Sequence, residues 1–337
     1  MRLSFLLLFA LALSTQVQAQ SYNSPESVDY DPVSNRYFIS NTNTSQILAR
    51  NSNNGELSVF ATLNNAPYGL EVVGTELYAC SGSGLRIFNL STGEETAYIN
   101  MGLNFPNGIT HKNNNIFLTD FSNNRIYRYN ITNGNYNVYI DNFPSTPNGI
   151  FYDDIADRLL VVSWGNNAPI YEINVSDSSH TVAANTTLGY LDGISMDNNG
   201  DFYFSAWSSN SIHKFTSDFV GAPTIVANSM SSPADIYYNR SVDTLAIPNS
   251  GNNTVVFLGF ESPNTIQEVY TTKVYPNPLT AGSTLSIEKD GNYQLLNQEG
   301  KLIWKGASTN KQLKLPNLQK GVYILKNTDY LAKLIIQ

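Results

Sequence analysis

Polar turns separate short stretches of alternating apolar and polar residues along most of the chain. Residues 191–215 show the plan, with an apolar run at 194–196 and alternating stretches at 202–206 and 212–215. Gly200, in the first turn, can take the positive φ that a tight connection needs. Alternation with a period of two predicts strands, and no stretch longer than a turn has a helical apolar period.

This plan recurs six times, and each copy opens with a similar short phrase. The third residues of the six phrases are Glu26, Tyr68, Asn107, Asn148, Asp192 and Ala234. Their spacings are 42, 39, 41, 44 and 42 residues. Six strand-rich units with a period near 42 residues predict an all-β fold, a six-bladed β-propeller over residues 20–262.

Two of the units illustrate how complete the blades are. The third predicts four strands, at 108–111, 116–120, 125–130 and 136–140. The sixth predicts three, at 235–238, 244–247 and 255–260. A fourth strand for the last blade must come from elsewhere, either from the N-terminal end or from 266–270.

A linker at 263–272 leads to a module of different character at 273–337. Its alternating stretches predict a small β-sandwich. They lie at 284–288, 293–297, 302–305, 312–315, 321–325 and 332–336. Residues 271–337 hold nine Lys and four acids, a charge of +5, whereas residues 1–270 hold ten Lys and Arg against 23 acids, a charge of −13.

Residues 1–19 have the pattern of a signal peptide. Arg2 precedes an apolar core from Phe5 to Leu13, and Val17 and Ala19 form a small-x-small cleavage site. The apolar core is too short for a lasting transmembrane helix, and no other segment is long and apolar enough. We therefore expect an exported protein without a transmembrane segment.

Charge and cysteine content narrow the choice of partners. An acidic large domain argues against nucleic acids and anionic membranes as partners. The only cysteine, Cys80, cannot form an internal disulfide, and its place in an apolar strand predicts a buried, inert thiol.

The tail, residues 273–337, carries four short motifs along its length. They are Tyr275-Pro276-Asn277-Pro278, residues 296–301 (LNQEGK), residues 318–325 (LQKGVYIL) and the closing Lys333-Leu334-Ile335-Ile336. In these pieces the tail resembles the type A C-terminal sorting domain of the type IX secretion system of Bacteroidetes. The resemblance implies contact with that secretion machinery through residues 273–337 and passage across the outer membrane. The tail is then usually removed, and the cargo is released or attached to the cell surface.

The repeats carry a second, weaker set of motifs. Ser24-Pro25-Glu26, Pro147-Asn148-Gly149-Ile150 and residues 191–197 (LDGISMD) resemble the SMP-30/gluconolactonase/LRE-like propellers and, more loosely, NHL-repeat propellers. The resemblance implies that Glu26, Asn148 and Asp192 bind one divalent cation, that Asn107 assists, and that Asp192 also acts as general base. Phe105 stands where sugar lactonases of that family often carry a substrate-binding Arg, which puts a sugar-lactone substrate in doubt.

The residue types agree with a cation site. The innermost strands of a propeller line its axis, so equivalent positions of six blades converge. Two carboxylates and two amide oxygens form a hard-oxygen ligand set suited to Ca²⁺, with Mg²⁺ and Mn²⁺ also compatible. There is no Cys/His cluster of structural-zinc type, although Zn²⁺ bound by oxygens stays open. Asn107 and Asn148 are equally compatible with a purely structural role as hydrogen-bonded turn residues.

Two classes of function remain open from the sequence. One is a metal-dependent hydrolase of a lactone or ester. The other is a non-catalytic NHL-like propeller that binds a ligand or a protein at the cell surface. No Ser/His/Asp arrangement with a nucleophile elbow occurs, His111 has no motif around it, and Trp164 and Trp207 are expected in the core between blades.

Overall fold

The computed structural model describes residues 20–260, 274–297, 301–327 and 331–337. They form two compact units divided between Phe260 and Glu261. The predicted signal peptide, 1–19, and the predicted linker, 263–272, lie outside the described residues. Within the described ranges no helix is long and apolar enough to cross a membrane.

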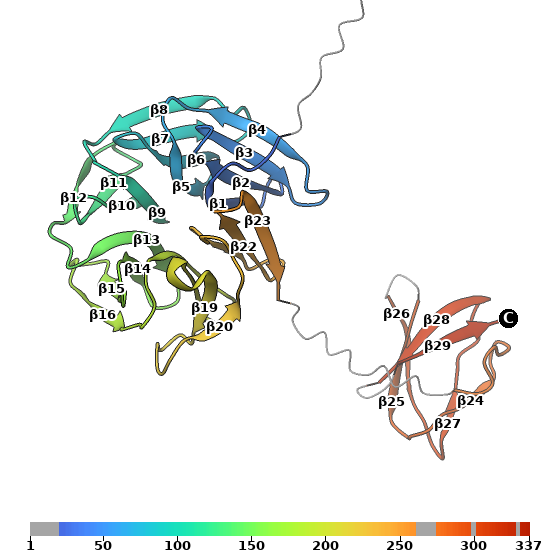
Figure 1. Ribbon diagram of the computed structural model, residues 1–337. Helices are drawn as coiled ribbons and strands as arrows, with labels where there is room; N and C mark the ends of the chain where they lie inside the picture. Colours follow the sequence, from blue (N-terminus) through green and yellow to red (C-terminus); the bar gives the residue numbers. More distant parts are fainter. Residues whose placement is uncertain (1–19, 261–273, 298–300, 328–330) are drawn as a thin grey trace, which may run out of the picture. The chain divides into compact units, whose positions relative to one another are not determined.

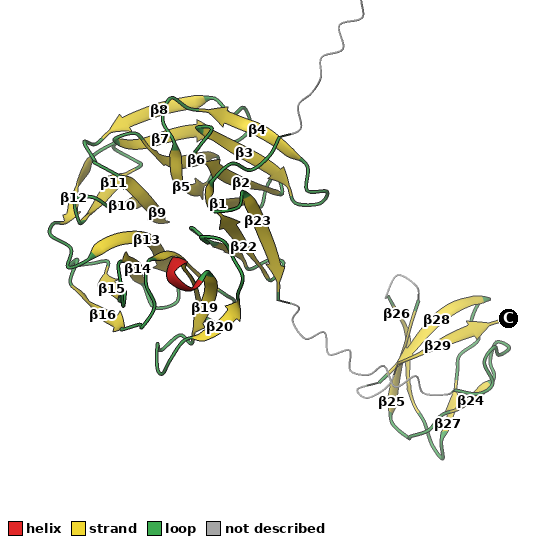
Figure 2. Ribbon diagram, viewed as in Figure 1, coloured by secondary structure: helices red, strands yellow, loops and turns green. Residues whose placement is uncertain are grey.

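The first unit is a ring of six antiparallel sheets, the blades of a β-propeller (Figure 1). Almost all of its regular structure is strand, as Figure 2 shows. The innermost strands, from blade 1 to blade 6, are β1 (Pro25–Asp31), β5 (Pro67–Val73), β9 (Pro106–Lys112), β13 (Thr146–Asp153), β17 (Leu191–Met196) and β21 (Tyr237–Asn239). The second strands are β2 (Arg36–Asn41), β6 (Glu76–Ser81), β10 (Asn115–Asp120), β14 (Arg158–Trp164), β18 (Phe202–Ala206) and β22 (Thr244–Asn249).

The outer strands complete the blades. The third strands are β3 (Gln46–Asn51), β7 (Gly84–Asn89), β11 (Arg125–Asn130), β15 (Ile170–Asn174), β19 (Ser211–Phe215) and β23 (Thr254–Gly259). The fourth are β4 (Leu57–Thr62), β8 (Glu95–Asn100), β12 (Tyr136–Ile140), β16 (His180–Ala184) and β20 (Thr224–Ala227). A short 3-10 helix, Trp207–Ser209, follows β18. The predicted six blades and the four strands of the third are confirmed.

Each blade is held by apolar contacts with its two neighbours. The second strands are buried over almost their whole length, because both of their faces pack against another sheet. One buried apolar cluster fills each of the six interfaces between blades. The cluster between blades 6 and 1 is the smallest, with Val28, Tyr37, Ile39 and Ala246 as its fully buried members. Partly buried rings of Tyr30, Tyr237 and Phe257 pack against it.

The sixth blade differs from its predicted form. Its inner strand starts at Tyr237 rather than at Asp235, because the Asp235 N–H donates to the Glu26 carbonyl of blade 1 over 2.8 Å. The sheet has three strands among the described residues, and residues 20–24 add none to it. The other proposed source of a fourth strand, 266–270, lies outside the described residues. Among the described residues, blade 6 therefore shares no strand with blade 1.

The second unit has two sheets around one core. A two-stranded sheet pairs β24 (Thr284–Ser286) with β27 (Gln312–Lys314). A four-stranded sheet has the order β26 (Leu302–Ala307), β25 (Asn292–Leu296), β28 (Gly321–Lys326) and β29 (Leu331–Ile336). Leu285 and Leu313 of the first sheet share one buried cluster with Leu295, Leu325 and Leu334 of the second. Two β-sheets around one core agree with the small β-sandwich predicted for this module.

Candidate functional site

Six equivalent positions at the start of the inner strands form what we call the axial ring: Glu26, Tyr68, Asn107, Asn148, Asp192 and Ala234. All four residues predicted as ligands are buried there. Asn107 Nδ2 donates to Asn148 Oδ1 over 2.6 Å, and Asn148 Nδ2 donates to the Leu191 carbonyl over 3.2 Å. The charge of Glu26 raises the pKa of Asp192, so these two carboxyls also lie near each other. The structure thus brings the predicted set together.

A β-bulge aims the ring side chains. In blades 1, 2, 4 and 5 the pairing of the inner strand with its neighbour shifts between the residue before the ring position and the residue two places after it. Blade 3 shows the same shift opposite Leu118 and Asp120. A bulge bends its strand and redirects one side chain, which makes it a common device beside active sites.

Glycine follows the ring residue in blades 2 to 5 because no side chain fits. A Cβ on Gly149 would lie 2.3 Å from the Asp192 carbonyl oxygen, and one on Gly108 would lie 2.4 Å from that of Asn148. These glycines have no positive φ, so the constraint is the close approach of neighbouring strands rather than an unusual backbone conformation. The spacing between successive ring residues depends on this contact.

Hydroxyl groups of the second strands fasten neighbouring inner strands together. Thr119 Oγ1 accepts from the Gly108 N–H over 2.8 Å and donates to the Asn148 carbonyl over 2.7 Å. Ser205 Oγ does the same between blades 5 and 6, since it accepts from the Gly193 N–H and donates to the Ala234 carbonyl, both over 2.8 Å. Cys80 has the corresponding place in blade 2, fully buried, and burial raises the pKa of its thiol well above the usual value. The predicted buried thiol is confirmed.

The acids of the ring are buried without a basic partner. Burial, and then the charge of Asp235, raises the pKa of Glu26 to about 8. Burial also raises the pKa of Asp192 well above its usual range, with further contributions from Glu26 and Asp235, while Asn148 and Trp207 oppose the shift. None of the ion pairs found in the described part of the chain involves any of these three acids.

Asp235 is a site residue that the sequence reasoning missed. It takes the place that glycine has in blades 2 to 5, one residue after the ring position, and burial raises its pKa to about 7. Its carboxylate accepts a hydrogen bond of 2.8 Å from Ser27 Oγ. Comparing the six phrases position by position would have shown an acid where four others have glycine.

The fit of a cation to this ring can be judged from the donor groups. Across residues 20–260 and the described parts of the tail, no group of three or more His, Cys, Asp or Glu is arranged to hold a metal. A site would therefore combine the carboxylates of Glu26 and Asp192 with the amide oxygen of Asn148. Such a mixed oxygen set is of the kind that Ca²⁺ takes.

Two tryptophans lie differently from their predicted positions. Trp164 ends β14 and Trp207 follows β18, and both are only half-buried. Their rings contact each other, with centroids 5.2 Å apart, and neither belongs to an inter-blade cluster. The prediction of core positions is wrong, because Trp164 is the last residue of β14 and Trp207 lies beyond the end of β18, past the residues that pack between blades.

A cavity of about 480 Å³ opens further along the inner strands. It begins at six buried aliphatic residues that each follow a ring residue by two places: Val28, Leu70, Ile109, Ile150, Ile194 and Ile236. Glu71 and His111 also line it, with 2.5 Å between Glu71 Oε1 and His111 Nδ1. This contact raises the pKa of His111, a residue that the sequence gave no reason to select.

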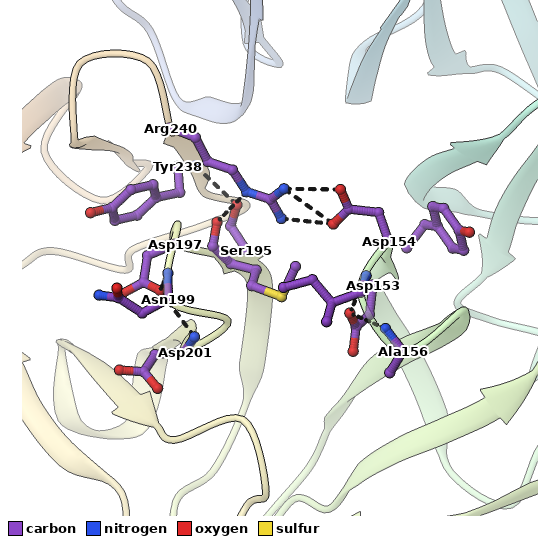
Figure 3. A network of polar contacts seen from close by, with 12 residues as sticks. Asp153, Asp154, Ala156, Ser195, Asp197, Asn199, Asp201, Tyr238 and Arg240 are labelled. Atoms are coloured by element: carbon purple, nitrogen blue, oxygen red, sulfur yellow. Dashed lines mark hydrogen bonds and ion pairs between the residues drawn. The ribbon is translucent and has the colours of Figure 1, made fainter.

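Arg240 lines an adjoining cavity of about 510 Å³. Figure 3 shows its guanidinium group directed at Asp154. Its Nε donates to the Met196 carbonyl over 3.1 Å, and its Nη atoms contact both oxygens of Asp154. One side chain of blade 6 thus reaches blades 5 and 4. Half of the Asp154 side chain is exposed, so this ion pair lies at the surface.

Residues 273–337 match the family model of the secretion system C-terminal sorting domain. This segment is a type IX secretion sorting domain. The match supports export of the protein to the cell surface or the medium. The sorting domain also accounts for the lysine-rich tail with its own small core.

The ring matches propellers of diverse function. A gluconolactonase from Xanthomonas campestris superposes with a TM-score of 0.59 at 17% identity, covering 68% of this chain and 84% of that one. Regucalcin from Agrobacterium tumefaciens, described as a calcium-binding protein, gives 0.59 at 15%, covering 71% and 91%. The nidogen/laminin complex gives 0.55 at 17%, covering 66% and 92%. At these identities the likeness shows the fold alone. No curated protein sequence matches the chain.

Proposed function

We propose that the exported propeller binds one divalent cation at its axial ring and hydrolyses a lactone or an ester there. The observation that carries the proposal is the pair of buried carboxyls, Glu26 and Asp192, with the partly buried Asp235 beside them and no basic partner for any of the three in the described ion pairs. A buried carboxylate is costly unless a cation or a proton neutralises it. A site that keeps several such groups together is suited to a cation.

Glu26 and Asp192 would supply charged oxygens to the cation, and Asn148 would supply its amide oxygen. Asn107 would orient that amide, because it already donates to Asn148 Oδ1 and leaves the second lone pair of the oxygen free. Ca²⁺ is the first candidate, which the calcium-binding regucalcin neighbour supports, and Mg²⁺, Mn²⁺ and Zn²⁺ are the others. When bound, the cation would polarise a carbonyl and lower the pKa of water.

Asp192 would act as the general base. A bound cation would keep this carboxyl deprotonated, and a deprotonated carboxylate beside the attacking water can accept its proton. It would take a proton from the attacking water as the water oxygen bonds to the carbonyl carbon. The bond from that carbon to the ring or ester oxygen then breaks, and Asp192 passes the proton to the departing oxygen. The products are a hydroxy acid from a lactone, or an acid and an alcohol from an ester.

The test is hydrolysis of a panel of lactones and esters by the full chain, treated with chelator and then reloaded with each cation. Asp192→Asn and Glu26→Gln should each abolish hydrolysis while the circular dichroism spectrum stays native. Glu71→Gln, a change at a partly buried acid that lines the cavity further along the inner strands, should leave it largely intact. Hydrolysis that survives in Asp192→Asn, or its absence with every cation, contradicts the proposal.

The second candidate is a non-catalytic propeller that binds a ligand or a protein at the cell surface. The ring amides favour it, since Asn107, Asn148 and the Leu191 carbonyl satisfy one another without a cation. The matching chain of the nidogen/laminin complex is a precedent of the same fold in a protein complex. Export through the predicted signal peptide and removal of the sorting domain would place either activity outside the cell.

A further inference from the structure

Six half-buried aromatic residues form a continuous row that we call the aromatic arc: Tyr68, Phe105, Phe121, Trp164, Tyr190 and Trp207. Neighbouring ring centroids are 4.7 Å (Tyr68–Phe105), 5.3 Å (Phe105–Phe121), 5.9 Å (Phe121–Trp164), 5.0 Å (Trp164–Tyr190) and 5.2 Å (Trp164–Trp207) apart. Apart from Tyr68, none of them belongs to the buried clusters between blades. The row therefore needs another explanation than core packing.

The arc lies at the same end of the inner strands as the axial ring. Phe105 directly precedes β9, and Phe121 follows β10, which returns antiparallel to that end. The Phe121 N–H donates to the Phe105 carbonyl over 2.9 Å, and the Trp207 N–H donates to the Tyr190 carbonyl over 3.1 Å. These backbone bonds fix the arc across blades 2 to 5, which follow one another around the axis (Figure 1).

The two ends of the arc reach the two acids of the proposed site. Tyr68 is close enough to Glu26 for that charge to raise the pKa of its phenol, after the larger effect of burial. Trp207 is close enough to Asp192 to lower the pKa of that carboxyl. The indole N–H of Trp207 stabilises the charged form of this carboxyl, so the arc ends at a group of the proposed site.

Small polar groups border the ring where blades 6 and 1 meet. Ser24 Oγ and Ser250 Oγ are 2.7 Å apart, and the Ser24 N–H donates to Asn253 Oδ1 over 2.7 Å. The surroundings of the ring are thus aromatic over blades 2 to 5 and hydroxyl- and amide-lined at the ring closure. A ligand that matches both sides has a flat apolar part and a polar part.

We propose that the aromatic arc binds the aryl part of the substrate, so that the substrate is an aromatic lactone or aryl ester rather than a sugar lactone. This inference rests on the proposed function. Successive ring planes of the arc turn by 56° to 76°, so they offer alternating edges and faces instead of a flat platform. Aromatic rings pair well with both edges and faces, whereas the hydroxyls of a sugar would find few partners there.

Two δ-lactones test the inference directly. Dihydrocoumarin is δ-valerolactone with a fused benzene ring, and glucono-δ-lactone is the hydroxylated comparison. We expect kcat/KM for dihydrocoumarin to exceed that for δ-valerolactone by about 10- to 100-fold, after correction for their uncatalysed hydrolysis rates. In Trp164→Ala and Phe121→Leu this preference should fall towards parity. Tyr136→Ala is the control, because Tyr136 is an exposed aromatic residue of an outer strand, and it should leave the preference unchanged.

An equal kcat/KM for the two lactones in the native protein, or a preference that survives in both arc variants, overturns the inference. A binding assay separates this failure from failure of the hydrolase proposal. In a Trp304→Phe background, Trp164 and Trp207 are the remaining tryptophans, and excitation at the long-wavelength edge selects their emission over that of tyrosine. Titration with 3,4-dihydro-2-quinolinone, the unhydrolysed amide analogue, should change their emission, and δ-valerolactam should not. That result supports the arc even if no lactone is hydrolysed; no change with either amide contradicts it.

Discussion

The backbone N–H of Asp235 donates a 2.8 Å hydrogen bond to the carbonyl oxygen of Glu26. This bond joins the last blade to the first, and it does so at the axial ring itself. Ser27 reinforces the junction, because its Oγ donates to Asp235 Oδ2 over 2.8 Å and accepts from the Leu70 N–H over 3.1 Å. The contacts that close the ring of blades therefore also position residues of the candidate site.

Ser27→Ala should lower the unfolding free energy by about 1–3 kcal/mol, because it leaves the partly buried Asp235 carboxyl and the Leu70 N–H without their partner. Urea denaturation followed by fluorescence measures this difference. Ser58→Ala, at an exposed position of β4, is the control and should change stability by less than about 0.5 kcal/mol. Equal stabilities of the two variants would show that Ser27 does not hold the ring closed.

Gly149→Ala should cost about 1–3 kcal/mol of stability and weaken any ligand at the ring, since the added methyl group would meet the Asp192 carbonyl. Gly259→Ala is a matched control, because a Cβ there has its nearest neighbour 3.9 Å away. Both variants are compared by thermal unfolding. A Gly149→Ala protein as stable as Gly259→Ala would contradict the role assigned to the close approach of the strands.

Much of this arrangement follows from local sequence. Strict alternation between turns gave the bounds of β11 and β12 as the structure has them. Spacing alone aligned the ring positions, because one unit of about 42 residues makes one blade. The role of Asp235 does not follow from alternation. Its backbone bonds to a residue more than 200 positions away, so only closure of the ring places it on the axis.

The pH dependence of stability should reveal the buried acids beyond the ring. Burial raises the pKa of Asp29 well above its usual value, and the charges of Glu71 and Asp235 raise it further. The folded state then holds this proton to a higher pH than the unfolded state does. Stability is therefore highest below the unfolded pKa and is lost as the pH rises through the folded one.

Asp29→Asn should flatten that decline by up to about 1.4 kcal/mol per pH unit, the limit for one proton. The measurement is urea denaturation from pH 4 to pH 9 in the presence of chelator. Asp141→Asn is the control. Arg125 lowers the pKa of that exposed carboxyl, so its ionisation changes stability only at acid pH. An unchanged slope in Asp29→Asn would show that Asp29 ionises normally.

The aromatic arc marks the limit of what the sequence could predict. Phe105, Phe121, Trp164 and Trp207 occur in three different units, each beside or at the end of a strand, where a core role and a rim role look alike. Alternation indicates which face of a strand is buried, but not where the packed face ends. That boundary depends on how far each strand extends past its neighbour in the adjacent blade.

Calorimetric titration of the chelator-treated full chain with Ca²⁺ tests the central claim most directly, beside Asp192→Asn and Glu71→Gln. We expect one cation per chain in the native protein and in Glu71→Gln, and none in Asp192→Asn. Release of protons should accompany binding, because Glu26 and Asp192 have raised pKa values without the cation. No binding of Ca²⁺, Mg²⁺, Mn²⁺ or Zn²⁺ by the native chain, or equal binding by Asp192→Asn, would contradict a cation at the axial ring.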